Sequence, residues 1–247
     1  FQIVIKLTKL STLVFSSLLS TNCLFAQNTY EIKNLGDAIN SEYAELNPVI
    51  SADGKKLYFV RSNHPQNQNP TDGQDIWMSE KDENGNWKPA INLGKTFNKQ
   101  QFNTLFNISP SGNRMLIGGS YKDGVYWGVG FSFIEKRDGI WREPYELDIK
   151  KLDKLNNGVY SSAYLLPDNQ TLLLSFSQDE DGKENNLYVS KLGKNGRWSE
   201  PVSLGAKVNT TYDESTPFMA ADGVTLYFSS NRQGGYGQND IYLTRRL

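Results

Sequence analysis

The feature that most constrains the fold is a unit of 54 to 58 residues that occurs four times along the chain. The marker residues Asp53, Ser111, Asp168 and Asp222 each lie in a short turn, and successive markers are 58, 57 and 54 residues apart. Four residues after each marker an apolar run begins, at Leu57, Met115, Leu172 and Leu226. A fixed period of this length indicates a repeat architecture.

A second pattern keeps the same period and divides each unit further. Asn84-Gly85, Asp138-Gly139 and Asn195-Gly196 each stand two residues before a tryptophan, namely Trp87, Trp141 and Trp198. Asn-Gly and Asp-Gly between apolar runs are typical of hairpin turns, because both residues tolerate positive φ. Each unit therefore predicts four short antiparallel strands, and we expect the tryptophans to pack in the core.

Four such units predict an all-β fold, a β-propeller with four blades of four antiparallel strands. The apolar runs show no polar alternation, as expected for strands buried on both faces. Neighbouring blades would cover those two faces.

The residues of the repeat resemble a known family. The run Ser51-Ala52-Asp53-Gly54-Lys55-Lys56-Leu57-Tyr58-Phe59, followed by Asp75-Ile76, is similar to the WD40-like β-propeller repeat of the TolB type. The segments 39–48 and 208–217 resemble the variant found in bacterial cell-envelope proteins, where it often precedes an OmpA-like peptidoglycan-binding domain. The resemblance covers residues 35–247, although unit 2 has Ser111 for the turn aspartate and Trp127-Gly128-Val129 for Asp-Ile-Tyr. It implies envelope proteins as partners, with carbohydrate or peptidoglycan as a further class.

Residues 1–26 have the pattern of a signal peptide. Lys6 and Lys9 precede an apolar, serine-rich stretch, and Ala26 is a suitable cleavage position. We therefore expect one propeller domain over residues 27–247, exported to the periplasm or associated with the outer membrane, with no transmembrane span after cleavage. An uncleaved anchor and lipidation at Cys23 are the alternatives, but Asn22 fits a lipidation signal poorly.

The N-terminal segment predicts how the ring closes. Leu35-Gly36-x-x-Ile39-Asn40 repeats the pattern of residues 93–98 and 204–209, whereas unit 4 has no tryptophan strand. We expect residues 30–35 to pair antiparallel with residues 241–244, so that no sheet edge stays open. The alternative is a piece of a longer ring or of a longer chain.

The polar loops 62–74, 120–126, 177–185 and 229–239 are expected to gather on one face of the ring. The candidates for ligand contact are Arg61, Tyr121 and Arg232, with Trp127 and Tyr236 as stacking groups. The alternative is that these loops are solvated turns, with Arg232 and Asp240 forming a structural ion pair.

Little in the sequence points to catalysis. The net charge is −1 and no basic patch indicates a nucleic-acid partner. His64 is the single histidine, in a polar loop where we expect it to be exposed, and no Gly-x-Ser-x-Gly motif occurs. We expect no cofactor and no metal; Asp179, Glu180 and Asp181 are more typical of a solvated turn than of a calcium loop.

The sequence thus favours a non-catalytic binding or scaffolding module. The alternative is a propeller glycosidase or sialidase-like enzyme, whose paired carboxylates would meet only in space. Acids and arginines clustered at the central channel would favour the enzyme, and an apolar or merely polar channel would favour the scaffold.

Overall fold

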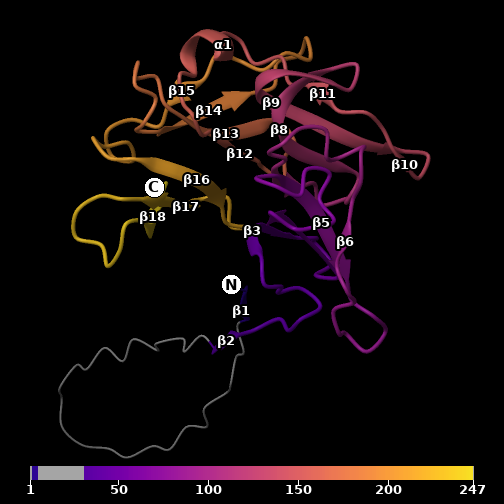
Figure 1. Cartoon of the computed structure of the whole chain (residues 1–247). Helices are drawn as coiled ribbons and strands as arrows, with labels where there is room; N and C mark the ends of the chain where they lie inside the picture. Colours follow the sequence, from indigo (N-terminus) through magenta and orange to yellow (C-terminus); the bar gives the residue numbers. More distant parts are fainter. Residues whose placement is uncertain (1, 5–30, 247) are drawn as a thin grey trace, which may run out of the picture.

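The computed structural model describes residues 2–4 and 31–246. These form four antiparallel sheets arranged as a ring of propeller blades, and a separate two-stranded sheet (Figure 1). Blade 1 holds β3 (Ala44–Ile50), β4 (Lys56–Ser62), β5 (Gln74–Glu80) and β6 (Ile91–Asn92). Blade 2 holds β7 (Leu105–Ile108), β8 (Arg114–Lys122), β9 (Val125–Arg137), β10 (Ile140–Trp141) and β11 (Tyr145–Glu146). Blade 3 holds β12 (Ser162–Leu165), β13 (Thr171–Phe176), β14 (Asn186–Lys191) and β15 (Val202–Ser203). Blade 4 holds β16 (Glu214–Met219), β17 (Thr225–Ser230) and β18 (Asp240–Arg245).

The prediction of an all-β, four-bladed propeller is confirmed, with one short helix, α1 (Leu152–Leu155), between blades 2 and 3. The number of strands per blade varies more than the repeat suggested. In blade 2 the long β9 pairs with both β10 and β11, and blade 4 has three strands among the described residues.

Each marker turn places a glycine or asparagine in the left-handed backbone conformation that a tight turn needs. In the first turn the Gly54 amide donates to the Ser51 carbonyl (2.9 Å), and Gly54 has φ +68°. Asp53 accepts hydrogen bonds from the Ser51 hydroxyl (2.6 Å) and the Lys55 amide (3.0 Å). In unit 3 Asn169 replaces the glycine and takes the same left-handed conformation, which asparagine tolerates better than most residues.

Three hydrophobic cores join successive blades. Tyr58 and Ile76 of blade 1 pack with Leu105 and Ile117 of blade 2. The core between blades 2 and 3 includes Phe131, Leu174 and Trp198, and the core between blades 3 and 4 includes Leu173, Leu187 and Phe228. The apolar runs are buried as predicted, except that Tyr227 of unit 4 is 36% exposed. Trp198 is the one tryptophan of the three that is fully buried; Trp87 and Trp141 are half-buried.

The predicted closure by the N-terminal strand is wrong. β2 (Glu31–Lys33) pairs antiparallel with β1 (Gln2–Val4), and not with β18. A three-residue strand specifies its partner through backbone hydrogen bonds alone, so the sequence pattern could indicate that a strand forms but not where it pairs. The rest of the signal segment, residues 5–26, lies outside the described residues, as does its cleavage position.

Among the described residues, none of the helices is long and apolar enough to span a membrane.

Candidate functional site

The central channel is lined by the innermost strand of every blade. Residues of β3, β7, β12 and β16 enclose a cavity of about 370 Å³. The lining residues are all uncharged: Asn47, Pro48, Val49, Ile50, Leu105, Phe106, Asn107, Ile108, Ser162, Ala163, Tyr164, Thr216, Pro217 and Phe218. The channel therefore offers apolar surface and neutral hydrogen-bonding groups, with no side chain that could act as an ionised acid or base.

Two strained residues shape this channel. Asn47 and Thr216 both have φ +48°, and each precedes a proline at a break in strand register. Positive φ is costly for the β-branched Thr216, whose amide donates to the Ser162 hydroxyl (3.1 Å) of the neighbouring blade. The bulges direct Pro48 and Pro217 toward the channel, where they add rigid apolar surface.

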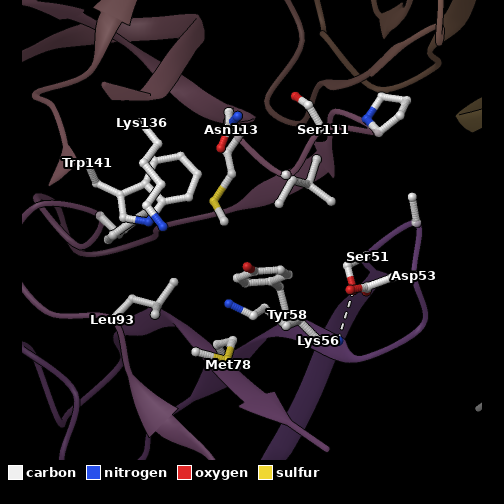
Figure 2. Close-up of a pocket in the computed structure, with 16 residues that line it drawn as sticks. Ser51, Asp53, Lys56, Tyr58, Met78, Leu93, Ser111, Asn113, Lys136 and Trp141 are labelled. Carbon is white, nitrogen blue, oxygen red and sulfur yellow. Dashed lines mark hydrogen bonds between the residues drawn. The ribbon is translucent and has the colours of Figure 1, made fainter. Parts of the chain in front are cut away.

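A larger groove lies between blades 1 and 2, beside the marker turns 51–54 and 110–113 (Figure 2). It has a volume of about 500 Å³. Lys56 and Tyr58 from β4 lie on one side, and Lys136 lies beside Trp141 on the other, with its Nζ 5.9 Å from the indole centroid. This groove combines two cations with the three aromatic rings of Tyr58, Phe97 and Trp141.

The titrating groups of the groove are held in defined states. The hydrogen bond from the Ser51 hydroxyl, with the Lys55 amide, lowers the pKa of Asp53. Burial, together with the charges of Asp53 and Glu80, raises the pKa of Tyr58. At neutral pH the groove thus presents one carboxylate and a neutral phenol. Ser51 donates to Asp53 and has no imidazole beside it, so this arrangement can bind a ligand but holds no activated nucleophile.

The groove continues toward blade 3. Ser111, Asn113 and Lys136 also line a cavity of about 450 Å³ that reaches Asn169. On this side Glu135 bonds Arg114 (2.6 Å) and Arg137 (2.9 Å). Burial acts to raise the pKa of Glu135, but hydrogen bonds from Arg137, Tyr145 and Arg114 lower it overall. The turn face of blades 1 to 3 is therefore a connected polar surface that carries both cationic and acidic groups.

Arg61, a predicted ligand residue, is buried in the protein. Its Nη2 donates to the Ile39 carbonyl (2.7 Å) and its Nε to Glu45 (3.0 Å). The guanidinium also lies against the rings of Phe59 and Trp77. With 5% of its surface exposed, Arg61 is fully used in holding the segment before blade 1 in place.

Arg232 has matching contacts in blade 4. Its Nη2 donates to the Val208 carbonyl (3.0 Å) and to Glu214 (3.0 Å), and it lies against Phe228 and Tyr242. The predicted ion pair between Arg232 and Asp240 is wrong. Asp240 accepts instead from the backbone amides of Tyr236 (2.7 Å) and Gly237 (3.2 Å), because the loop folds back over it.

The other three predicted ligand residues differ in exposure. Tyr121 is buried beside Tyr126, and burial raises its pKa to about 12. Trp127 is 68% exposed, with Lys122 over its ring, and Tyr236 is fully exposed. The five residues are divided among blades 1, 2 and 4. Ligand contact therefore stays a prediction, and only Trp127 and Tyr236 have side chains exposed enough to make it.

His64 is only partly exposed, contrary to expectation. Its ring makes edge contacts with Tyr43 and Trp77, with centroids 5.0 and 4.5 Å away. Burial and the charge of Arg61 lower its pKa, so it is neutral at neutral pH. Within the described ranges there is no group of three or more His, Cys, Asp or Glu side chains able to hold a metal ion.

The sequence interpretation missed Lys56, Lys136 and Trp141. The available signal was the repeat itself, because the marker turns that define the period also form the rim of the groove.

Comparison with known proteins finds similar solved structures, all at low sequence identity. No protein-family model matches the chain, and no curated protein matches it. Similar solved structures include one described as TolB from Agrobacterium tumefaciens (15% identity, TM-score 0.47). The match covers 84% of this chain and 60% of that protein. An endo-arabinase from Bacteroides thetaiotaomicron (18% identity, TM-score 0.49) covers 88% of the chain, which spans 80% of that enzyme. A GH43 endo-arabinanase from Bacillus licheniformis (14% identity, TM-score 0.46) covers 81%, and the chain spans 73% of it.

Proposed function

We propose that this protein is a non-catalytic binding or scaffolding module of the bacterial cell envelope. The observation that carries the proposal is the uncharged lining of the central channel. Hydrolysis of a glycosidic bond normally requires two carboxyl groups on either side of it, and the channel supplies none.

The binding surface in this proposal is the groove between blades 1 and 2. Lys56 and Lys136 provide cations from opposite sides, while Tyr58 and Trp141 provide apolar faces with polar edges. Aromatic and cationic side chains around a concave surface favour an extended segment with acidic side chains. The partner in this proposal is therefore an acidic segment of another envelope protein.

Export is part of the same proposal. The positive and apolar stretches before Ala26 support removal of residues 1–26. Mass spectrometry of the protein isolated from its native envelope should give a chain that begins near Gln27. Recovery of peptides that contain Lys6 and Lys9 from the folded protein would contradict export by cleavage.

The binding proposal can be tested by site-specific photo-crosslinking in the native envelope. A photoreactive residue at Asn113, in the groove, should give one discrete protein adduct. The adduct should disappear when Lys56 and Lys136 are both replaced by glutamate. The matched control is the same photoreactive residue at Tyr160, which is exposed near α1, outside the groove.

The rival enzyme hypothesis makes a different prediction. Purified protein that released sugars from an arabinan or another polysaccharide, and lost this activity on replacement of one acidic residue, would overturn the proposal.

A further inference from the structure

Blade 2 carries a hairpin that extends beyond the repeat. Its two central strands, β8 and β9, have 9 and 13 residues, whereas the equivalent strands of the other blades have 6 or 7. The extension ends at the turn Asp123-Gly124, where both residues have positive φ. This turn follows the end of β8, whereas the marker turn 109–112 precedes its start. The extension therefore lies apart from the groove between blades 1 and 2.

The two faces of the extension differ. On one face Tyr121 is buried in the core between blades 1 and 2 and makes an edge contact with Tyr126. The other face presents Val125 and Trp127, which are 62% and 68% exposed. Lys122 pairs opposite Val125, and its Nζ lies 5.1 Å from the centroid of the Trp127 ring. Exposed apolar side chains gathered on one sheet face mark a binding surface.

The edge of β9 is open along this extension. On one side β9 pairs with β8. On its other side β10 and β11 pair only with residues between 132 and 137, and the bond nearest the extension runs from the Leu147 amide to the Phe131 carbonyl (2.9 Å). No strand of the described chain pairs with this side of β9 over residues 125–130. An open edge beside an apolar face is a template for a further strand.

A cavity of about 470 Å³ lies at the base of the extension. Lys122 and Val129 line it from the hairpin, and Val129 is 64% exposed. The apolar part of the lining belongs to the core between blades 2 and 3: Phe131, Leu147, Ile149 and Leu152. Opposite the hairpin the cavity is bounded by α1, which has no counterpart in the other blades among the described residues. Both walls of the cavity are thus departures from the repeat.

The charged groups of this cavity are not balanced. One cation, Lys122, and three carboxylates, those of Glu146, Asp148 and Asp153, line it. Asp148 is paired with Arg197 (2.6 Å). Glu146 and Asp153 are exposed, and neither forms an ion pair with another side chain of the described chain. This end of the open edge is therefore negatively charged and favours a partner that brings a basic residue to it.

We propose that an extended segment of a partner protein adds as a strand to the open edge of β9 over residues 125–130. The segment runs antiparallel to β9, as β8, β10 and β11 do, and so continues the line of β11. Its N-terminal end then lies at the cavity, where a lysine or arginine faces Glu146 and Asp153. Apolar side chains at alternate positions of the segment pack on Val125 and Trp127.

Fluorescence polarisation with the full chain tests the proposal. The probe is the labelled peptide Arg-Val-Thr-Val-Thr-Val-Thr, for which we expect saturable binding. The same peptide with glutamate in place of arginine should bind at least about tenfold more weakly, because it brings a like charge to the cavity. An arginine peptide that does not bind, or that binds no better than the glutamate peptide, would overturn the proposal.

Two substitutions place the peptide on this surface. Trp127→Ala and Glu146→Lys should each weaken binding of the arginine peptide by at least about tenfold. The matched controls are Tyr236→Ala, a fully exposed aromatic residue of blade 4, and Glu83→Lys, an exposed glutamate of blade 1. Both controls should leave the affinity unchanged, and equal losses in variants and controls would contradict binding at this edge.

The groove between blades 1 and 2 gives an independent control. Replacement of Lys56 and Lys136 by glutamate should abolish the proposed groove adduct but leave peptide binding to the β9 edge unchanged. The two proposals therefore fail separately.

Methylation of peptide amides distinguishes strand addition from contact with side chains alone. Alternate amides of an added strand point toward β9, so N-methylation of one alternate set should abolish binding and N-methylation of the other set should preserve it. Binding that survives both modifications would refute strand addition. A soluble oligosaccharide that displaced the peptide from the unmodified protein, and bound more tightly than it, would assign the surface to carbohydrate and likewise refute the proposal.

Discussion

At the scale of single residues, Arg61 and Arg232 reach the same environment from different positions in the repeat. Each bonds a backbone carbonyl and a glutamate of the Asn-Ser/Thr-x-Tyr-x-Glu pattern, through Ile39 and Glu45 or through Val208 and Glu214. The glutamates are also held by Ser41 and Thr210 hydroxyls. The environment is therefore set by the segment before the blade, and an arginine at either of two positions near the start of the following loop can fill it.

Replacement Arg61→Ala should destabilise the domain by about 3–5 kcal/mol, because it leaves the poorly exposed Glu45 without its cation. Arg61→Lys should recover only part of this loss, since an ammonium group cannot reproduce the two-sided contact. Urea unfolding monitored by tryptophan fluorescence measures the change. Tyr236→Ala, at a fully exposed position, should stay within about 0.5 kcal/mol of the unmodified protein.

The turn aspartates give stability a defined pH dependence. Hydrogen bonds from the Thr225 hydroxyl and amide and from the Val224 amide lower the pKa of Asp222 from 3.8 to about 2. Because the folded-state pKa is depressed, the stabilisation by the carboxylate is complete above pH 3.8 and is lost as the pH falls toward 2.

Thermal unfolding of Asp222→Asn and of the unmodified protein checks this window. The difference in melting temperature should be constant at pH 5 to 7 and should shrink steadily below pH 4, where the aspartate is protonated in the unfolded state. A difference that grew on acidification would mean that the carboxylate is not stabilised by this turn.

At the scale of elements, the tryptophan strands are equivalent in sequence but not in packing. Trp198 lies in the core between blades 2 and 3, and its amide donates to the Asp148 carbonyl (2.9 Å). Trp87 is half-buried against blade 1, with Lys81 over its ring. A neighbouring blade covers Trp198 completely, whereas residues 34–40 cover Trp87 from one side.

We therefore expect Trp198→Ala to cost about 3–5 kcal/mol and Trp87→Ala about 1–2 kcal/mol. The two variants serve as controls for each other in denaturant unfolding, because they delete the same side chain at the same repeat position. Equal losses would show that burial in a blade junction does not set the cost.

The strands could be predicted from sequence because each depends on local signals. Turn residues with positive φ, such as Gly54 and Asn169, and apolar runs such as β13 are visible in any one unit. The groove and the closure could not be predicted in the same way. Lys136 and Lys56 meet across two blades, and the pairing of β2 depends on backbone groups that carry no sequence signature.

At the scale of the whole molecule, the three interblade cores bind the four blades into a continuous series, and the outer edge of that series is β18. Within the described chain β18 pairs with β17 alone, whereas β14 pairs with strands on both sides. A strand with a free edge opens at lower free energy than one paired on both sides.

Hydrogen exchange should therefore show a gradient across the propeller. In dilute protein the amides of β18 should exchange fastest among the long strands, and those of β13, paired on both sides and buried on both faces, slowest. Peptide-resolved mass spectrometry measures both in one sample. Exchange in β18 as slow as in β13 would contradict this gradient.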